Sequence, residues 1–311
     1  MLTHLSLFTG IGGLDLAAEW AGFQTVGQCE WADYPTKVLE KHWPSIPRWR
    51  DIRTLTWESF YEKTELRTVD IISGGFPCQP FSLAGKQKGK GDDRYLWPEM
   101  LRVIRELTPR WVIGENVPGI LRIAAADVVQ DLEREGYDVA VFDFEAAAVG
   151  APHRRERIAF LANTKGIRCD HGDDGENARQ AHRKINSSTN ESILRRKRID
   201  SYSSIARNGK LSIQQRRSPE ADVNIDGLCK IISNTESRWK QGEQSSWGET
   251  WSSCGCLRWP AEPNVGRVAY GIPNRVDRLR CLGNAVVPQQ FYPFFKAIAD
   301  IEKESENADP R

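Results

Sequence analysis

Residues 69–82 read Val-Asp-Ile-Ile-Ser-Gly-Gly-Phe-Pro-Cys-Gln-Pro-Phe-Ser, an apolar run followed by a loop rich in glycine and proline. The run predicts a buried strand over residues 69–73. The loop presents Cys78 at the exit of this strand, where open α/β sheets bind their ligands. Pro77 and Pro80 stiffen the loop, because each fixes its own backbone dihedral and restricts the residue before it. Cys78 is therefore a candidate nucleophile, although a cysteine taken at random is more often a small buried apolar residue.

Strand and helix patterns alternate on both sides of this stretch. Further strands are expected at residues 5–8, 25–29, 111–114, 137–144 and 157–161, and helices at 14–20, 98–107 and 120–135. This β-α-β alternation predicts an α/β fold with a Rossmann-like, doubly wound sheet. Beyond the middle of the chain, a helix is expected at 275–282, where Gly283, Asn284 and Ala285 break it, and a last helix from Pro288. The apolar residues of the last helix suit packing against the first domain.

The middle of the chain differs in composition from both ends. Residues 163–264 show weak apolar periodicity and many Ser, Asn, Arg and Gly residues, which fits a disordered insert or a loop-rich second domain. Four tryptophans between positions 239 and 259 favour order in the later part. We expect one domain from residues 1–163 plus about 276–305, and a smaller, loop-rich domain from about 164–275.

Overall charge says little about partners, because 43 Lys plus Arg residues face 42 Asp plus Glu residues in a chain of 311. Its distribution is more informative. Residues 165–217 hold 13 basic and 6 acidic residues, a local net charge of +7 that is a candidate nucleic-acid footprint. Charge runs of this kind are more often solvated surface.

Seven cysteines at irregular spacing in a chain of this size indicate a reducing compartment. A zinc site from Cys229, Cys254 and Cys256 is not expected, since structural zinc usually takes four ligands. The sequence shows neither a secretory signal nor an apolar run of 18 residues, so a cytoplasmic protein without a membrane segment is expected.

The first predicted turn, Phe-Thr-Gly-Ile-Gly-Gly at residues 8–13, lets a ligand approach the backbone at a helix N-terminus. Gly-x-Gly alone is not specific. The dinucleotide fingerprint needs Gly or Ala at position 15, and Asp15 stands there instead. An acidic side chain suits a cationic ligand, such as the amino group of S-adenosylmethionine, better than a pyrophosphate.

Two acidic residues end predicted strands. Glu30 comes about twenty residues after the first turn, where an acid can hold ribose hydroxyls, and Trp31 beside it could stack on an adenine. Glu115 follows the strand at 111–114, so its carboxyl group should emerge at the same sheet edge as Cys78 and donate a proton near neutrality. For Glu30 and Trp31, an ordinary strand end is about as common as a binding role. For Glu115, a cap on the helix that follows is about as common as a catalytic role.

A basic cluster, His-Arg-Arg-Glu-Arg at residues 153–157, precedes the strand at 158–161. Alternate residues of an extended segment face the same way, so Arg155 and Arg157 should share a side. Two guanidinium groups there could hold a phosphate or a base carbonyl. Such clusters are more often solvated edges.

In this order the segments resemble the motifs of DNA (cytosine-5)-methyltransferases of the bacterial and phage restriction-modification type. The resemblance covers about two thirds of the chain, at its two ends. It rests on residues 8–13, Glu30-Trp31, Asp51-Ile52, 75–79, 115–117, Arg155 with Arg157, and 283–288. The match at 75–79, Gly-Phe-Pro-Cys-Gln, resembles the family's nucleophile loop and is the most specific.

The resemblance implies S-adenosyl-L-methionine as cofactor, S-adenosyl-L-homocysteine as its product, and no metal. The implied cofactor-binding residues are Phe8, Gly10, Gly12, Gly13, Asp15, Glu30, Trp31, Asp51, Ile52, Pro77, Asn284, Ala285 and Val286. The implied catalytic residues are Cys78, Glu115, Asn116, Arg155 and Arg157.

Each catalytic residue has an implied role toward a cytosine rotated out of double-stranded DNA. Cys78 would add to carbon 6, and Glu115 would hydrogen-bond ring nitrogen 3 and the exocyclic amine. Asn116 would orient the loop of Glu115. Arg157 would steady Glu115 or the loop of Cys78, and Arg155 would touch the base carbonyl.

The resemblance also implies partners and surroundings. The domain at about 164–275 would recognise the DNA target, its basic residues contacting phosphates. We also expect a monomer in the cytoplasm of a bacterial or phage-infected cell. A companion restriction endonuclease would act separately. The sequence departs from the family pattern in two places. His153 stands where many members have Gln. The family's next-to-last motif is hard to place, and residues 267–278 match it only loosely.

Three other functions compete with this interpretation. A tRNA cytosine-5 methyltransferase of the same sequence family would share the catalytic motifs and differ in the middle region. A non-catalytic DNA-binding protein on the same scaffold is disfavoured by the intact Cys78 and Glu115. An NAD-dependent oxidoreductase is disfavoured by Asp15 and the cysteine loop.

Overall fold

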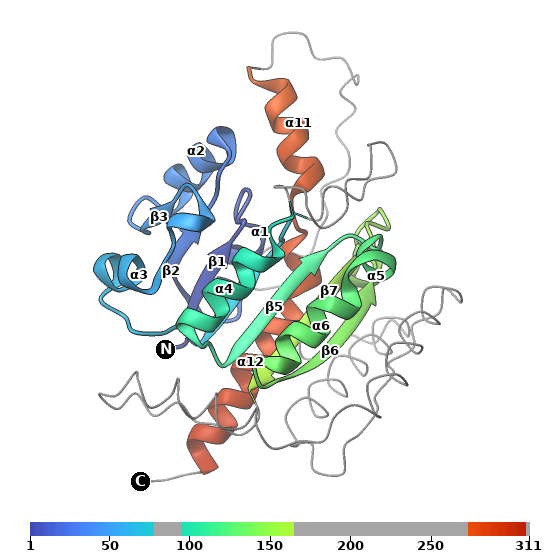
Figure 1. The fold of residues 1–311 in the computed structure, drawn as a ribbon. Coiled ribbons are helices and arrows are strands. Elements are labelled where there is room, and N and C mark those ends of the chain that lie inside the picture. Colours follow the sequence, from blue (N-terminus) through green and yellow to red (C-terminus); the bar gives the residue numbers. More distant parts are fainter. Residues whose placement is uncertain (78–94, 165–272, 309–311) are drawn as a thin grey trace.

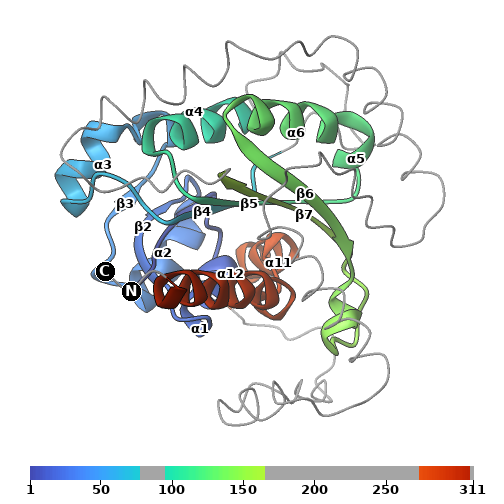
Figure 2. The same ribbon diagram turned by 90° about the horizontal axis from the view of Figure 1, so that it is seen from below.

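The computed structural model describes residues 1–77, 95–164 and 273–308 (Figure 1). Cys78 and nearly all of the expected second domain lie outside the described residues. The described parts form three layers, a central sheet with helices on each face (Figure 2).

The sheet of the described chain has seven strands in the order β3-β2-β1-β4-β5-β7-β6. Neighbours from β3 through β5 run parallel, whereas β7 runs antiparallel to both β5 and β6. The expected α/β fold is confirmed, with a mixed sheet. The bounds are β1 (Thr3–Leu7), β2 (Gln24–Cys29), β3 (Arg48–Trp49), β4 (Ile71–Gly74), β5 (Trp111–Asn116), β6 (Tyr137–Phe144) and β7 (Arg157–Thr164).

Helices cover both faces of the sheet. Helices α4 and α6 lie on one face, and α1 and α12 lie on the other (Figure 2). In the described part of the chain, no helix is both long and apolar enough to cross a membrane. The helices are α1 (Gly13–Trp20), α2 (Asp33–His42), α3 (Trp57–Thr64), α4 (Trp97–Leu107), α5 (Ile120–Ile123), α6 (Ala125–Arg134), α11 (Arg275–Asn284) and α12 (Pro288–Ala308), with short 3₁₀ turns η1 (Ile52–Thr54) and η3 (Ala146–Val149).

Alternate residues of the central strands supply two separate cores. Ile72 and Val112 pack on the side of α4 and α6, whereas Ile71 and Ile113 pack on the side of α1 and α12. This follows from the two-residue repeat of a strand. Burial on both faces also explains why β4 and β5 read as nearly continuous apolar runs rather than alternating ones.

Helix α12 completes the second core, as its apolar residues predicted. Phe291, Phe294, Phe295 and Ile298 are buried with the residues of α1. Near the far end of the helix, the buried carboxylate of Glu302 accepts a hydrogen bond of 2.7 Å from Nε1 of Trp111 and pairs with Arg110. The helix is thereby fixed to the beginning of β5.

Several elements depart from the sequence-based expectation. The helix expected at 120–135 is divided at Ala124, whose φ of −145° and ψ of 0° are not helical. Helix α11 continues through Gly283 to Asn284 instead of stopping at 282. Helices α2 and α3 and strand β3 were not anticipated, although Thr56 and Ser59 form a reciprocal capping box at the start of α3.

Candidate active site

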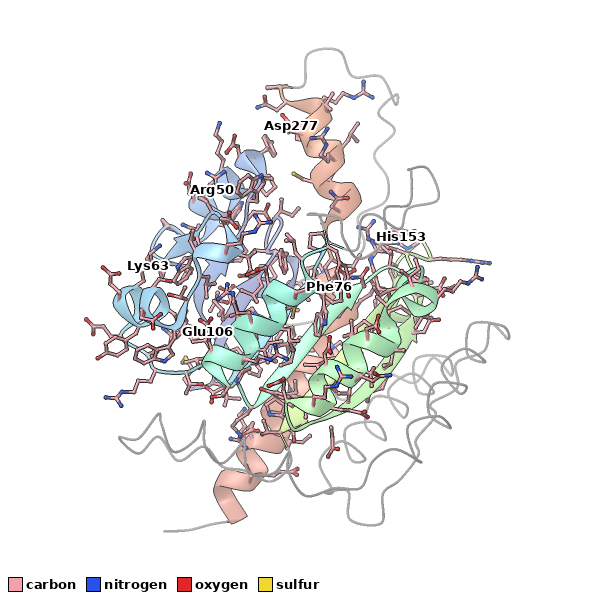
Figure 3. All side chains as sticks on the ribbon, in the orientation of Figure 1. Arg50, Lys63, Phe76, Glu106, His153 and Asp277 are labelled. Atoms are coloured by element: carbon pink, nitrogen blue, oxygen red, sulfur yellow. The ribbon has the colours of Figure 1, made fainter. Side chains whose placement is uncertain are left out.

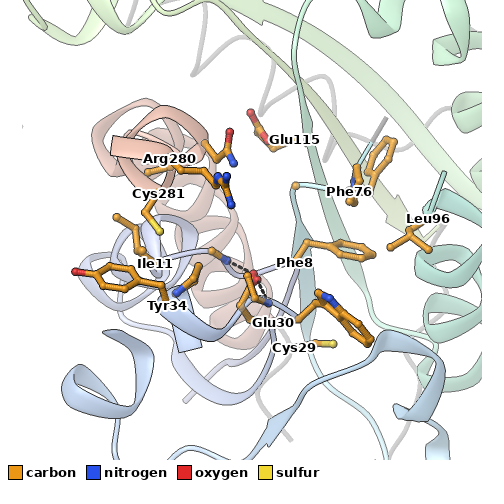
Figure 4. A pocket seen from close by; sticks show the side chains of 18 of the residues that line it. Phe8, Ile11, Cys29, Glu30, Tyr34, Phe76, Leu96, Glu115, Arg280 and Cys281 are labelled. Atoms are coloured by element: carbon orange, nitrogen blue, oxygen red, sulfur yellow. Dashed lines mark hydrogen bonds between the residues drawn. The ribbon is translucent and has the colours of Figure 1, made fainter. Parts of the chain in front are cut away.

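The strand order reverses between β1 and β4, because the chain proceeds from β1 toward β3 on one side and from β4 toward β5 on the other. Ligands of doubly wound sheets bind outside the carboxyl ends of the strands at such a point. A cavity of about 1200 Å³ opens there, beneath α11 (Figure 4). Twelve of the expected site residues line it: Phe8, Gly10, Glu30, Trp31, Asp51, Ile52, Pro77, Glu115, Asn116, Arg157, Asn284 and Ala285.

The turn after β1 places backbone donors around the Glu30 carboxylate. Phe8, Gly10 and Gly12 all have positive φ angles, of 51°, 58° and 89°, so the chain curls tightly before α1. The amide of Gly10 donates to Glu30 Oε2 at 2.7 Å, and the amide of Ala32 donates to Oε1 at 2.8 Å (Figure 4). Each carboxylate oxygen can accept a second hydrogen bond, so Glu30 is held in place with acceptor capacity left for a ligand.

Gly12, Gly13 and Val286 do not line the cavity and act through packing instead. A Cβ on Gly12 would lie 2.4 Å from the ring of Trp43. A Cβ on Gly13 would lie 2.5 Å from the main-chain oxygen of Val286. These two glycines are therefore required where the start of α1 meets other parts of the chain, and they affect the cavity through packing.

Asp15 requires a correction, because it does not face the cavity. Its side chain is fully buried and accepts hydrogen bonds from Ser6 Oγ at 2.9 Å and from Gln28 Nε2 at 2.8 Å. Burial raises the pKa of Asp15 to about 6, against the lowering effect of these two partners. The carboxyl group joins α1 to β1 and β2, and direct contact with a cationic ligand is excluded in this arrangement.

Trp31 and Asp51 line the cavity beside Glu30. Trp31 is 71% exposed, which is unusual for so large an apolar side chain and leaves its ring open to a partner. Arg50 donates to the main-chain oxygen of Trp31 at 2.8 Å and pairs with Asp33, so the backbone beneath the ring is fixed. Asp51 caps η1 by accepting from the amide of Arg53 at 3.0 Å.

The other end of the cavity contains a buried ion pair. Glu115, at the end of β5, accepts from Arg157 Nε at 2.7 Å, and both side chains are 12% exposed. Burial raises the pKa of Glu115 to about 7, although Arg157 and Arg155 act to lower it. Gly75 lies against the carboxyl group, since a Cβ there would be 2.7 Å from Oε2. The expected interaction of Arg157 with Glu115 is therefore present.

Asn116 connects this acid to the loop that leads to Cys78. The amide nitrogen Nδ2 of buried Asn116 donates to the main-chain oxygen of Phe76 at 3.0 Å, and its Oδ1 accepts from the amide of Val117. Phe76 is itself buried against Trp97, near the middle of the molecule (Figure 3). The start of the cysteine loop is thus bound to the acid's strand as far as Pro77, while Cys78 lies outside the described residues.

Arg155 also requires a correction. Its φ is +42°, so residue 155 precedes the extended segment, and the expected shared side with Arg157 does not arise. Arg155 does not line the cavity. Its guanidinium group donates to the main-chain oxygens of Leu282 at 3.3 Å, Gly283 at 2.8 Å and Ala285. The side chain is occupied by the junction between α11 and α12, and contact with a base carbonyl is not compatible with this arrangement.

Sequence reasoning missed the cavity residues that α2 and α11 supply. Tyr34 and Lys37 come from α2, and Asp277, Arg280 and Cys281 come from α11 (Figure 4). Asp277 projects from α11, well beyond the sheet, and His153 lies on the loop before β7 (Figure 3). Helix α11 has no buried residue, so apolar periodicity could not have revealed its position over the cavity.

Comparison with known proteins shows the family of the chain. Residues 2–262 match the model of the family described as C-5 cytosine-specific DNA methylase. The type II methyltransferase M.FnuDI of Fusobacterium nucleatum is 34% identical over 168 residues, which are 52% of this chain and 47% of that protein. The type II methyltransferase M.AquIA of Picosynechococcus sp. is 33% identical over 178 residues, covering 52% of this chain and 72% of that protein.

The matched part thus spans about half the length of the Fusobacterium relative. Among solved structures, a DNMT2 mutant from Spodoptera frugiperda has a TM-score of 0.54 at 17% identity, covering 96% of this chain and 99% of that one, a likeness of fold alone. The family match extends over most of the sequence and includes the strands that carry Glu30 and Glu115. The chain therefore belongs to the C-5 cytosine-specific DNA methylase family.

Proposed function

We propose that this protein transfers a methyl group from S-adenosyl-L-methionine to carbon 5 of a cytosine in double-stranded DNA. One observation carries the proposal: a single cavity has the backbone-held Glu30 beside Trp31 at one end and the buried Glu115–Arg157 pair at the other. Its volume of about 1200 Å³ exceeds the roughly 300–1000 Å³ usual for one small ligand. The cavity therefore has room for a cofactor and a nucleobase together.

The cofactor end fits a nucleoside. Glu30 keeps acceptor capacity for the two ribose hydroxyls, because its two oxygens are oriented by the amides of Gly10 and Ala32. The open ring of Trp31 offers a surface for an adenine. Asp51 and Ile52 lie at the same end, with Asn284 and Ala285 on the opposite wall. When bound, S-adenosyl-L-methionine supplies an electrophilic methyl group.

The acid end fits proton transfer to a pyrimidine. Carbon 5 of cytosine is a poor nucleophile until a thiolate adds at carbon 6. In the proposed step the sulfur of Cys78 forms a bond to carbon 6, the electron pair of the 5,6 double bond becomes available at carbon 5, and Glu115 protonates ring nitrogen 3. After methylation, carbon 5 gives its proton to a water molecule and the sulfur–carbon bond breaks, while ring nitrogen 3 returns its proton to Glu115; the thiolate, the acid and the aromatic ring are thereby restored.

The pKa of Glu115 suits this role. Burial raises this pKa to about 7, so the carboxyl group is partly protonated at neutral pH. Arg157 fixes the orientation of the carboxyl group from one side. Gly75 leaves room for it on the other side. Asn116 holds the main chain of Phe76, two residues before the proposed nucleophile. Together these residues orient the acid and the start of the cysteine loop toward one point.

The substrate must be unstacked for this chemistry, since neither face of a stacked base can reach an enclosed site. We expect residues of about 164–275 to grip the duplex and recognise its sequence. Phosphate contacts from the basic stretch at 165–217 would make binding strongly salt-dependent. The proposal includes a monomeric cytoplasmic enzyme and a companion restriction endonuclease that acts separately.

The test is transfer of labelled methyl groups from S-adenosyl-L-methionine to duplex DNA from a host without cytosine methylation. We expect transfer by the wild type, loss of transfer in Cys78→Ser, and retained binding of S-adenosyl-L-homocysteine in that variant. DNA carrying 5-fluorocytosine should form a heat-stable covalent complex, because the fluorine cannot leave as a proton does. Labelling of tRNA but not of DNA would replace the DNA substrate, and turnover by Cys78→Ser would refute the nucleophile.

A further inference from the structure

We infer that Arg155 is a positioning residue that fastens the junction of α11 and α12 over the cofactor end of the cavity. The inference rests on the proposed function, since the ligand beneath this junction would be S-adenosyl-L-methionine. It replaces the expected contact between Arg155 and the base with a contact inside the protein.

The guanidinium group of Arg155 lies at the end of α11, where helix carbonyls lack intrahelical partners. It donates to the oxygens of Leu282 at 3.3 Å, Gly283 at 2.8 Å and Ala285. A cation at this position also interacts favourably with the negative end of the helix dipole. A single side chain therefore satisfies several carbonyls of the segment that ends α11.

The contact is reciprocal, because α12 holds the main chain of Arg155. Gln290, which is 1% exposed, donates from Nε2 to the oxygen of Arg155 at 3.0 Å and to that of Phe144 at 3.4 Å. The φ of Arg155, +42°, is uncommon for a residue other than glycine. Such a conformation persists where the surroundings impose it, and here the constraints come from both helices of the junction.

The opposite side of the junction is equally confined. The main-chain oxygen of Val286 lies where a Cβ of Gly13 would be, so the junction rests directly on the start of α1. Between these contacts, Gly283, Asn284 and Ala285 line the cavity. Helix α11 buries none of its own residues. Contacts at its end therefore contribute to its position over the cavity, and Arg155 supplies three hydrogen bonds there.

The same loop reaches the other end of the cavity two residues later, where Arg157 pairs with Glu115. The two arginines thus have different roles: Arg157 orients the Glu115 carboxyl group, and Arg155 holds the junction of α11 and α12. Loss of Arg155 should weaken cofactor binding in the absence of DNA, whereas loss of a base contact should not.

The experiment is calorimetric titration of S-adenosyl-L-homocysteine into the full-length protein without DNA, for wild type, Arg155→Ala, Arg155→Lys and Arg154→Ala. Arg154 is an exposed neighbour of equal charge and serves as the matched control. We expect about tenfold weaker binding in Arg155→Ala, partial recovery in Arg155→Lys and no change in Arg154→Ala. The KM for S-adenosyl-L-methionine should rise in parallel and by a larger factor than any fall in kcat at saturation, since Arg155 also acts on the pKa of Glu115.

Unchanged cofactor binding together with weaker DNA binding or lower kcat would overturn the inference in favour of a base contact. Hydrogen exchange separates this failure from failure of the proposed function. In Arg155→Ala without any ligand, amides 282–287 should exchange faster while those of β5 stay protected. Faster exchange at the junction supports the inference even if the wild type binds no S-adenosyl-L-homocysteine, and unchanged exchange there refutes it.

Discussion

Two glutamates lie at the ends of β2 and β5 in the same sheet, and their surroundings differ in kind. Glu30 receives main-chain amides on both oxygens, at 2.7 and 2.8 Å. Glu115 faces a side-chain cation, Arg157, at 2.7 Å in a buried setting. Main-chain donors cannot move or change charge, so they fix a carboxylate as a permanent acceptor. A buried carboxyl group beside one arginine can gain and lose a proton, so it can serve as an acid.

The comparison teaches that the partners of a carboxyl group, more than its place at a strand end, decide what it does. Glu30 directly follows β2, Glu115 is the last residue but one of β5, and both line the cavity. If the contrast is correct, substitutions at Glu115 should affect turnover and its pH dependence, and substitutions at Glu30 should affect cofactor affinity.

The largest expected effect is that of Glu115→Gln on methyl transfer. The amide keeps the shape of the side chain but cannot give a proton, so kcat should fall by roughly 10²–10⁴-fold. Calorimetry with S-adenosyl-L-homocysteine should show nearly unchanged affinity. A rate close to that of the wild type would place the acid elsewhere.

A second expectation concerns stability and pH. Burial raises the pKa of Glu115 from 4.5 to about 7, so the folded protein holds a proton that the unfolded chain loses between these values. The stability from this proton is fully present below about pH 4.5 and is lost as the pH rises through about 7, an effect on the order of 3 kcal/mol.

Denaturant unfolding of wild type and Glu115→Gln from pH 5 to pH 8 measures this effect. The wild type should lose more stability than the variant as the pH rises. Burial also raises the pKa of Asp15 to about 6 and of Asp143 to about 7, but both titrate in each protein and cancel in the difference. Parallel stability curves would contradict a buried, protonatable Glu115.

A smaller effect is expected from Gly75→Ala, which tests the space beside the acid. The new Cβ would lie 2.7 Å from Glu115 Oε2, and the ion pair with Arg157 prevents an easy retreat. Displacement of the carboxyl group by a fraction of an ångström should reduce kcat by roughly thirtyfold. Gly119→Ala is the control, because its Cβ would meet no atom within 4 Å. Equal rates in the two variants would contradict the close approach.

The smallest effect is expected from Glu30→Gln. Only one atom of the new amide can accept, so one of the hydrogen bonds from Gly10 and Ala32 is lost. Affinity for S-adenosyl-L-homocysteine should fall about tenfold, while kcat at saturating cofactor changes less than about twofold. Titration calorimetry and a KM measurement separate the two quantities. A large loss of kcat at saturation would remove the contrast with Glu115.

Much of the fold and half of the site followed from local patterns. The apolar runs of β4 and β5 predicted buried strands, and Glu30 and Glu115 were correctly expected at strand ends that meet in one cavity. Such statements need only the two-residue and 3.6-residue repeats and the rule for parallel sheets.

The sequence-based predictions that were wrong concern residues whose contacts lie in segments far away in the chain. Asp15 occupies a position suited to a ligand, yet Gln28 and Ser6 take up its carboxyl group. Arg155 precedes a strand, yet its left-handed backbone turns the side chain toward carbonyls about 130 residues later. Helix α11 carries Val276, Leu279 and Leu282, but these apolar side chains are exposed, so their spacing does not reveal which part of the molecule the helix adjoins. Local propensity carries no information on such contacts.

Helix α12 has a consequence for how the protein is made. It supplies Phe291, Phe294 and Phe295 to the core that backs β4 and β5, although it is translated after residue 287. A ribosome that has translated the first 164 residues has therefore polymerised every strand of the sheet that the structure describes, but one face still lacks its cover. We expect the nascent chain to stay incompletely folded and dependent on chaperones until α12 emerges. A chain terminated before α12 should therefore have no activity on DNA.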